Sequence, residues 1–213
     1  MRYYVLFILI TLVTFAFAAE KSPVQMYFQN PTTQSFQDAW NACNQALAKD
    51  STSSSTKILM ATIANYEAER LVQELYPNRM NLDAGSKFQL ANYFLEKEKY
   101  EDAIPLYQSL NDSIPDWSCP WRHKGTALYM TKKYKEAEAS LKKAVETNKE
   151  HYDAYIWLAK TQYQLKEYKL ALQNLETGMK LSPEAENSED MGFTDDNVTS
   201  LHKELKKKLK IKD

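Results

Sequence analysis

The sequence predicts an all-α protein, an α-solenoid of stacked helix-turn-helix units with capping helices, and three observations lead to this fold class. Glycine and proline are scarce, at 4 and 7 of 213 residues, which favours helices over turns and short strands. Residues of the same kind recur at a fixed interval along the middle of the chain. Within each interval the apolar residues follow the spacing of one face of a helix.

The interval is 34 residues, and it relates three consecutive units, 84–117, 118–151 and 152–185, without a gap. Each unit has a tyrosine, an alanine three positions after it, and a small residue nine positions before it. These positions hold Tyr100, Tyr134 and Tyr168; Ala103, Ala137 and Ala171; and Ala91, Gly125 and Ala159. The small side chains predict that two antiparallel helices approach each other closely within each unit.

The third unit illustrates why each unit is expected to be a pair of helices. Its first half carries a helical stripe at i, i+3, i+4 and i+7, formed by Tyr155, Leu158, Ala159 and Gln162. A second stripe begins at Tyr168 and continues through Ala171, Leu172 and Leu175. Pro183 then stops the second helix, because proline has no N–H to donate to a continuing helix.

This pattern resembles the tetratricopeptide repeat family, whose units are helix-turn-helix hairpins of 34 residues. The middle unit matches the family's ladder of aromatic, small and aliphatic residues with Trp121, Gly125, Tyr134, Ala137, Leu141 and Ala144. The resemblance implies a right-handed superhelix whose hairpins pack through Ala91, Tyr100, Ala103, Trp121, Gly125, Tyr134, Ala137, Leu158, Ala159, Tyr168 and Ala171. Lys87, Lys124 and Lys149 depart from the family pattern, which weakens single contacts without changing the register.

Both ends of such a stack need a covering element. Residues 36–83 are predicted to be a degenerate N-terminal helix pair, and residues 19–35, which lack periodicity, are predicted to be an extended leader. Residues 186–213 are predicted to be an acidic linker followed by a capping helix. The apolar stripe of this helix is Val198, Leu201, Leu205 and Leu209, and its other side is rich in lysine.

Residues 1–18 have the layout of a secretory signal peptide, with Arg2, an uncharged apolar run and Ala16-Phe17-Ala18 before the expected cleavage site. We therefore expect an exported protein, periplasmic or secreted, with a bacterial envelope favoured. An uncleaved N-terminal anchor is the competing interpretation, although the run is shorter than the ~20 residues of a spanning helix. The triplets that begin at Asn111 and Asn197 match glycan acceptors and keep the lumen of the endoplasmic reticulum or the extracellular space open for a eukaryotic protein.

No catalytic motif occurs in the sequence, and we expect the protein not to be an enzyme. Phosphate-binding loops, metalloprotease motifs and nucleophile elbows are absent, and the three histidines are scattered. Cys43 and Cys119 lack the spacing of a metal or redox site, and we expect two separate, buried and unbridged thiols. A net charge of −1 lacks the basic field of a nucleic-acid-binding protein. The sequence therefore predicts no cofactor, no metal and no nucleic acid partner.

By the same resemblance, the first helix of each unit lines a concave groove and supplies candidate protein-binding residues. The candidates are Phe88, Asn92, Arg122, His123, Thr126, Tyr129, Ile156, Lys160 and Tyr163, with Gln89, Leu95, Met130, Asp153, Trp157 and Gln164 beside them. They form a mixed apolar and polar strip with two cations, Arg122 and Lys160, suited to an extended peptide or a helix. Any one of them alternatively packs against neighbours inside the stack.

One subfamily of tetratricopeptide repeats grips the C-terminal carboxylates of chaperones with lysine, asparagine and arginine. This sequence keeps Asn92 but has Phe88, His123, Asp153 and Trp157 at the other clamp positions, which disfavours chaperone tails.

The resemblance therefore implies a non-enzymatic adaptor or scaffold of the cell envelope that binds a peptide or helix of a partner protein. The alternative is a membrane-surface protein that acts through peripheral contact of its lysine-rich C-terminal helix or through an uncleaved N-terminal anchor. The identity of the partner and the oligomeric state stay open.

Overall fold

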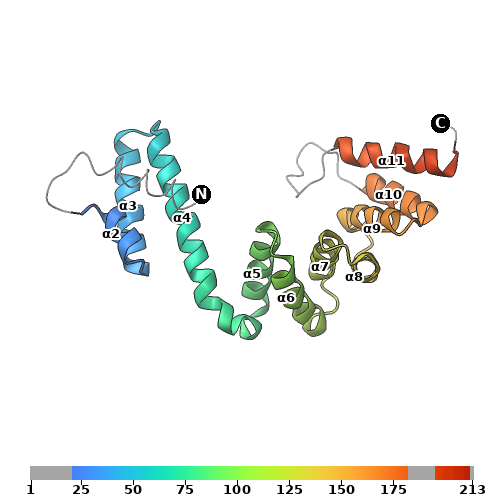
Figure 1. Ribbon diagram of the computed structural model, residues 1–213, viewed down its shortest axis with the longest axis horizontal. Coiled ribbons are helices and arrows are strands. Elements are labelled where there is room, and N and C mark those ends of the chain that lie inside the picture. The colour runs from blue at the N-terminus through green and yellow to red at the C-terminus, as the bar shows by residue number, and fades with distance from the viewer. Residues whose placement is uncertain (1–20, 182–194, 212–213) are drawn as a thin grey trace. The chain divides into compact units, whose positions relative to one another are not determined.

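The computed structural model describes residues 21–181 and 195–211, and the regular elements of these ranges are helices (Figure 1). The described chain is thus all-α, as composition and period predict. The predicted signal peptide and much of the predicted acidic linker lie outside the described residues. The chain divides into two compact units, Met1–Pro77 and Asn78–Asp213.

The three predicted repeats are three pairs of helices in the second unit. The first helices are α5 (Ala84–Glu96), α7 (Ser118–Met130) and α9 (Tyr152–Gln164). The second helices are α6 (Tyr100–Ser113), α8 (Tyr134–Thr147) and α10 (Tyr168–Leu181). Each helix therefore starts 34 residues after its counterpart in the preceding repeat. Helix α7 contacts α5 and α9 as well as its sequence neighbours, so the first helices share one face, which we call the inner face.

Small residues let the two helices of a repeat approach closely. A Cβ added at Gly125 of α7 would collide with Leu141 of α8, and one added at Gly178 of α10 would lie 2.8 Å from Cγ1 of Ile156 on α9. The predicted packing alanines Ala91, Ala103, Ala137, Ala159 and Ala171 are fully buried, and Leu158 is buried with them. Trp121, Tyr100, Tyr134 and Tyr168 are half-buried.

The first helix of every repeat ends in the same turn. Glu98, Lys132 and Lys166 have φ values of 58°, 62° and 64°, in the left-handed region. After α7, the N–H of Lys132 donates to the carbonyl of Tyr129 and that of Lys133 donates to the carbonyl of Leu128, each at 2.9 Å. This is the Schellman arrangement that usually places glycine at the left-handed position, because glycine has no Cβ to strain there.

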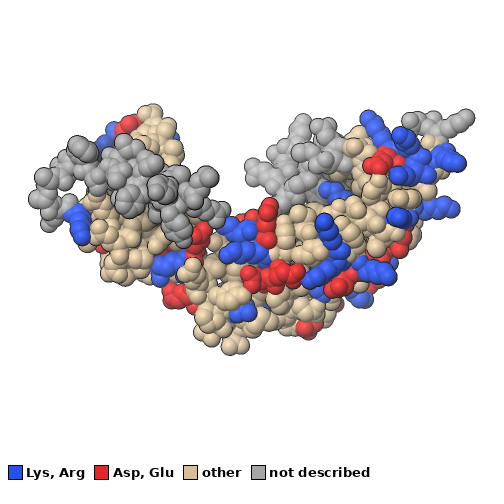
Figure 2. All heavy atoms as spheres, viewed as in Figure 1, with Lys and Arg blue, Asp and Glu red and all other residues tan. Residues whose placement is uncertain are grey.

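Helix α11 (Asp195–Leu209) caps the last repeat. Leu205 is fully buried in a core cluster with Leu172 and Leu175 of α10, and the other members of the predicted apolar stripe pack against that cluster. Helix α11 also contacts α9, so it extends the series of first helices by one. Lysine side chains gather on the surface of α11 (Figure 2).

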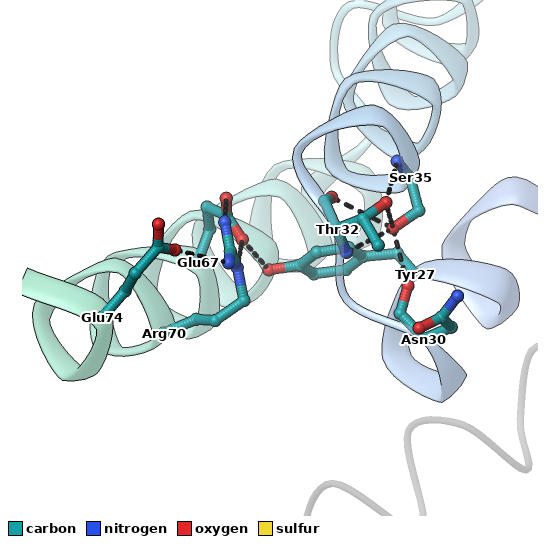
Figure 3. A network of polar contacts seen from close by, with 7 residues as sticks. All are labelled: Tyr27, Asn30, Thr32, Ser35, Glu67, Arg70 and Glu74. Atoms are coloured by element: carbon teal, nitrogen blue, oxygen red, sulfur yellow. Dashed lines mark hydrogen bonds and ion pairs between the residues drawn. The ribbon is translucent and has the colours of Figure 1, made fainter.

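The first unit contains α2 (Pro23–Gln29), α3 (Thr33–Lys49) and α4 (Ser54–Leu75), followed by the 3₁₀ helix η1 (Tyr76–Asn81). Tyr27 of α2 is fully buried against α3 and α4. Its hydroxyl donates to Glu67 Oε2 at 2.8 Å, and Arg70 donates to both oxygens of the same carboxylate at 2.8 and 2.7 Å (Figure 3). The hydrogen bonds from Arg70 lower the pKa of Glu67, although burial by itself would raise it.

An extended leader over residues 19–35 is a wrong prediction for residues 23–29, which form α2. The helix begins with a capping box, in which Ser22 Oγ accepts from the N–H of Gln25 and the Gln25 side chain accepts from the N–H of Ser22. Pro23 fills the first helical turn, where its missing N–H costs nothing. The helix pair predicted over residues 36–83 corresponds to α3 and α4, with α3 beginning earlier, at Thr33.

Candidate functional site

In the first half of the inner face, four aromatic side chains, Phe88, Tyr107, Trp117 and His123, pack against one another in a cluster. The ring centroid of Phe88 lies 4.6 Å from that of Trp117 and 5.4 Å from that of His123. His123 is stacked on Tyr107 at 5.6 Å, and the Tyr107 hydroxyl donates to Asn92 Oδ1 at 2.7 Å. The predicted groove residues Phe88, Asn92 and His123 are therefore engaged by other side chains of this chain.

His123 is neutral in the aromatic cluster. Burial, together with the positive charge of Arg122, lowers the pKa of His123 to about 3. A neutral imidazole between aromatic rings does not offer the charge-assisted hydrogen bond that a carboxylate terminus seeks.

Arg122 joins the second and third repeats through a buried ion pair. Its Nε donates to Oδ2 of Asp153 at 2.5 Å, and the two side chains are 5% and 4% exposed. His151 Nε2 lies 3.0 Å from the other oxygen of Asp153. Burial alone would raise the pKa of Asp153, but the neighbouring His151 and the charge of Arg122 hold it well below its ordinary value. The carboxylate therefore stays ionised and links α9 to α7.

Burial corrects the sequence-based expectation for three predicted groove residues, Arg122, Thr126 and Ile156. They are only 4%, 5% and 4% exposed. The Thr126 hydroxyl donates to the carbonyl of Arg122 at 3.2 Å, and Ile156 belongs to the core cluster shared by α9, α10 and α11. The positive charge that the sequence places in the groove at Arg122 is neutralised, because the third repeat places the Asp153 carboxylate against the Arg122 guanidinium.

The second half of the inner face contains a cleft. A cleft of about 370 Å³ lies between the end of α7, α9 and α11, and we call it the open cleft. Its lining is Tyr129, Met130, Trp157, Lys160, Tyr163, Gln164 and Leu201. The structure thus brings together the predicted groove residues Tyr129, Lys160 and Tyr163 and adds Leu201. The repeat period gives no signal for Leu201, because it comes from the helix beyond the repeats.

Aromatic rings and one cation meet at the open cleft, where Trp157 is only 8% exposed and belongs to a buried cluster with Leu141 and Leu158. The ring centroid of Tyr129 lies 5.4 Å from that of Trp157, and Lys160 Nζ lies over the Trp157 ring, 4.8 Å from its centroid. Burial lowers the pKa of Lys160, which marks a partly desolvated ammonium group. A cation held against an indole face in this way contributes a cation–π interaction and directs positive charge toward the cleft.

The hydroxyl of Tyr163 ties one wall of the open cleft to α11. It donates to Glu204 Oε1, and this hydrogen bond raises the pKa of Tyr163 to about 12. Met130 is 45% exposed beside these groups, and Gln164 contributes a side-chain amide. The cleft therefore combines apolar contact area with a few polar groups, which suits recognition of a side chain or short segment.

The two cysteines are free thiols in the structure. Cys43 of α3 is buried, and burial raises the pKa of its thiol. Cys119 of α7 is only half-buried, so the prediction of a buried thiol is corrected for this residue. Within the described ranges, no group of His, Cys, Asp and Glu side chains is arranged to hold a metal ion.

The glycan triplet at Asn111 lies on α6, where the Asn111 side chain is only 1% exposed. A glycan at this residue is incompatible with the folded repeat. The side chain of Asn197 lies outside the described part of the structure. Among the described helices, none combines the length and apolar character needed to cross a membrane.

Comparisons with known proteins agree with this architecture. A tetratricopeptide repeat family model matches residues 128–187. No curated protein matches the chain.

Solved structures show the same fold at low sequence identity. The first tetratricopeptide repeat domain of Spaghetti (RPAP3) bound to an HSP90 peptide is 21% identical with a TM-score of 0.52, over 60% of this chain and 93% of that one. The TPR2B domain of yeast Sti1, in a complex with pHsp70, is 22% identical with a TM-score of 0.52, over 59% and 97%. MamA is 12% identical with a TM-score of 0.52, over 91% and 88%. The family match and these structures show tetratricopeptide repeat sequence at residues 128–187 and the right-handed solenoid fold that the sequence predicts.

Proposed function

We propose that this protein is a non-enzymatic adaptor that binds a short segment of a partner protein in the open cleft. The observation that carries the proposal is the meeting of Tyr129, Trp157 and Lys160 at an open part of the inner face, beside the exposed Met130. The RPAP3 and Sti1 domains are solved in complexes with an HSP90 peptide and with pHsp70, which supports peptide binding by this kind of stack.

The chemistry of the inner face favours a segment with an apolar or aromatic anchor over a chaperone tail. The anchor would contact the rings of Tyr129 and Trp157, and an acidic or carbonyl group next to it would meet Lys160. In the other half of the face, Arg122 already pairs with Asp153 and His123 is neutral. A carboxylate clamp is therefore not expected there.

The proposal also places the protein outside the cytoplasm, in the cell envelope. Its support is the sequence of residues 1–18, with a positive start, an apolar run and a small-x-small end. The test is N-terminal sequencing of the protein from its native cells together with fractionation. A chain that begins at Ala19 in the exported fraction supports the proposal, and an intact Met1 in the cytoplasmic fraction contradicts it.

Affinity capture with a matched pair of variants tests the binding function. Residues 19–213, which include every described residue, are used to capture partners from the native envelope. Met130→Glu/Lys160→Glu changes the cleft, and Met179→Glu/Lys180→Glu makes the same changes at exposed positions of α10. A partner identified by mass spectrometry should bind the cleft variant about tenfold more weakly than the control. Equal retention by both variants, with unchanged circular dichroism, would place binding elsewhere.

A further inference from the structure

Helix α11 has a single apolar stripe, and that stripe is used to dock on the stack. Leu205 is fully buried, while Val198, Leu201 and Leu209 are only partly buried against α9 and α10. Two polar contacts add to the docking, from Tyr163 to Glu204 and between His202 Nε2 and Glu176 Oε1 at 3.1 Å. The cap is thus held by one fully buried residue, three partly buried ones and two contacts at exposed side chains.

The other side of α11 is strongly basic. Lys203, Lys206, Lys207, Lys208 and Lys210 lie on or directly after the helix, with Glu204 as the acidic residue among them. All of these lysines except Lys206 are exposed. Basic side chains gather over α11, at the end of the second compact unit (Figure 2). Lys208 Nζ lies 5.8 Å from the centroid of the Tyr168 ring, at the border between the basic side and the docked side.

A short helix with leucines on one side and lysines on the other is also the sequence type that lies in the interface of an anionic membrane. Its apolar stripe enters the boundary between headgroups and acyl chains, and its lysines are attracted to the negative surface potential. The stripe of α11 cannot contact the stack and the acyl chains at the same time. Docking and membrane binding are therefore mutually exclusive uses of Val198, Leu201, Leu205 and Leu209.

We propose that α11 is an exchangeable cap, which leaves the stack to bind an anionic lipid surface. Residues 182–194 separate it from α10 in the sequence. Membrane binding then uncovers Ile156, Leu172 and Leu175 of the third repeat.

The exchange also acts on the open cleft, a consequence that rests on the proposed function. Leu201 lines the cleft and Glu204 accepts from Tyr163, so departure of α11 removes one wall. Binding of a partner segment to the complete cleft and binding of α11 to the membrane therefore compete. Because linkage is reciprocal, each lowers the affinity of the other by the same factor.

Vesicle flotation tests the lipid proposal without any protein partner. Residues 19–213 should bind vesicles of phosphatidylglycerol and phosphatidylcholine roughly tenfold more strongly than vesicles of phosphatidylcholine alone. Lys203→Gln/Lys207→Gln/Lys210→Gln should abolish this preference. The control Lys135→Gln/Lys149→Gln/Lys169→Gln removes the same charge from exposed positions elsewhere and should retain it. Equal binding by the two triple variants overturns the proposal.

Cross-linking tests the exchange itself. Glu176→Cys/His202→Cys, in a chain with Cys43→Ala and Cys119→Ala, is joined by a cleavable bismaleimide so that α11 stays docked. The cross-linked protein should lose binding to anionic vesicles, and cleavage of the linker should restore it. On vesicles, the unlinked protein should show faster amide hydrogen exchange in α10. Undiminished binding by the cross-linked protein, or unchanged protection of α10 in the bound protein, overturns the exchange.

Discussion

The two halves of the inner face use equivalent positions of the repeat but differ in what their side chains contact. Phe88, Arg122 and Ile156 occupy one position in the three repeats, and Asn92, Thr126 and Lys160 occupy another. In the first half, these side chains meet aromatic rings, a buried carboxylate or backbone carbonyls of the same chain. In the second half, Ile156 is buried in a core cluster, and Lys160 lines the open cleft.

The repeat register fixes the backbone position from which a side chain projects. The side chains of neighbouring helices then determine whether it is exposed to solvent. Thr126 is buried against the carbonyl of Arg122, whereas the equivalent Lys160 is only partly buried and lines a cleft with Leu201 of α11. We therefore expect the half with the aromatic cluster and the ion pair to contribute mainly to stability, and the proposed function assigns recognition to the open cleft. Three predictions test this division.

The largest effect is expected from breaking the buried Arg122–Asp153 ion pair. Arg122→Met leaves an ionised carboxylate buried without its main partner and should lower the free energy of unfolding by about 3–5 kcal/mol. Urea titration followed by circular dichroism measures the change. The double variant Arg122→Met/Asp153→Leu should recover most of the loss, because it removes the unpaired charge. A single variant as stable as the wild type would show that the pair does not hold the repeats together.

A smaller effect is expected from acid, through His123. Its pKa is lowered to about 3 in the folded protein, whereas the unfolded chain binds a proton near pH 6.5. Between these values the unfolded state holds more protons, so stability falls as the pH drops through this window, by at most about 1.4 kcal/mol per pH unit from this one group. The free energy of unfolding is measured between pH 6.5 and 4.

Replacement of His123 by glutamine should flatten that part of the pH dependence. His202→Gln removes an imidazole from the polar contact with Glu176, outside the aromatic cluster, and serves as the control that keeps the slope. An identical slope in the wild type and in His123→Gln would mean that His123 is not held neutral by the aromatic cluster.

The smallest effect is expected at the turns, where the two halves are alike. Glu98→Gly after α5 and Lys166→Gly after α9 replace residues with positive φ and should each stabilise the protein by about 0.5–1 kcal/mol. Thermal unfolding measures both. Equal gains would show that the halves share one backbone and differ only in side-chain contacts, and a gain confined to one turn would contradict that.

Much of the fold could be predicted because it depends on local patterns. The 34-residue spacing of Tyr100, Tyr134 and Tyr168 matches the observed starts of α6, α8 and α10. The start of helix α2 could also have been predicted from the sequence, since Ser22, Pro23 and Gln25 form a capping signal. Its seven residues are too few for an apolar period to stand out.

The candidate site could be predicted only in part. Tyr129, Lys160 and Tyr163 line the open cleft, but Arg122, Thr126 and Ile156 face partners that the repeat pattern does not specify. The aromatic contacts of Trp117 and the cleft contact of Leu201 join residues from different helices, and no spacing along one helix reveals them.

The sequence by itself determined the helices, their pairing into hairpins and the repeat that stacks them, because helix periodicity and small packing residues act over short distances along the chain. Only the tertiary structure decided which equivalent side chains are neutralised, stacked or left open. That outcome depends on what the neighbouring helix presents, as Asp153 does to Arg122 and α11 does to Tyr163. Burial and charge pairing are properties of the assembled stack, and they give one repeated surface an aromatic cluster, a buried ion pair and an open cleft.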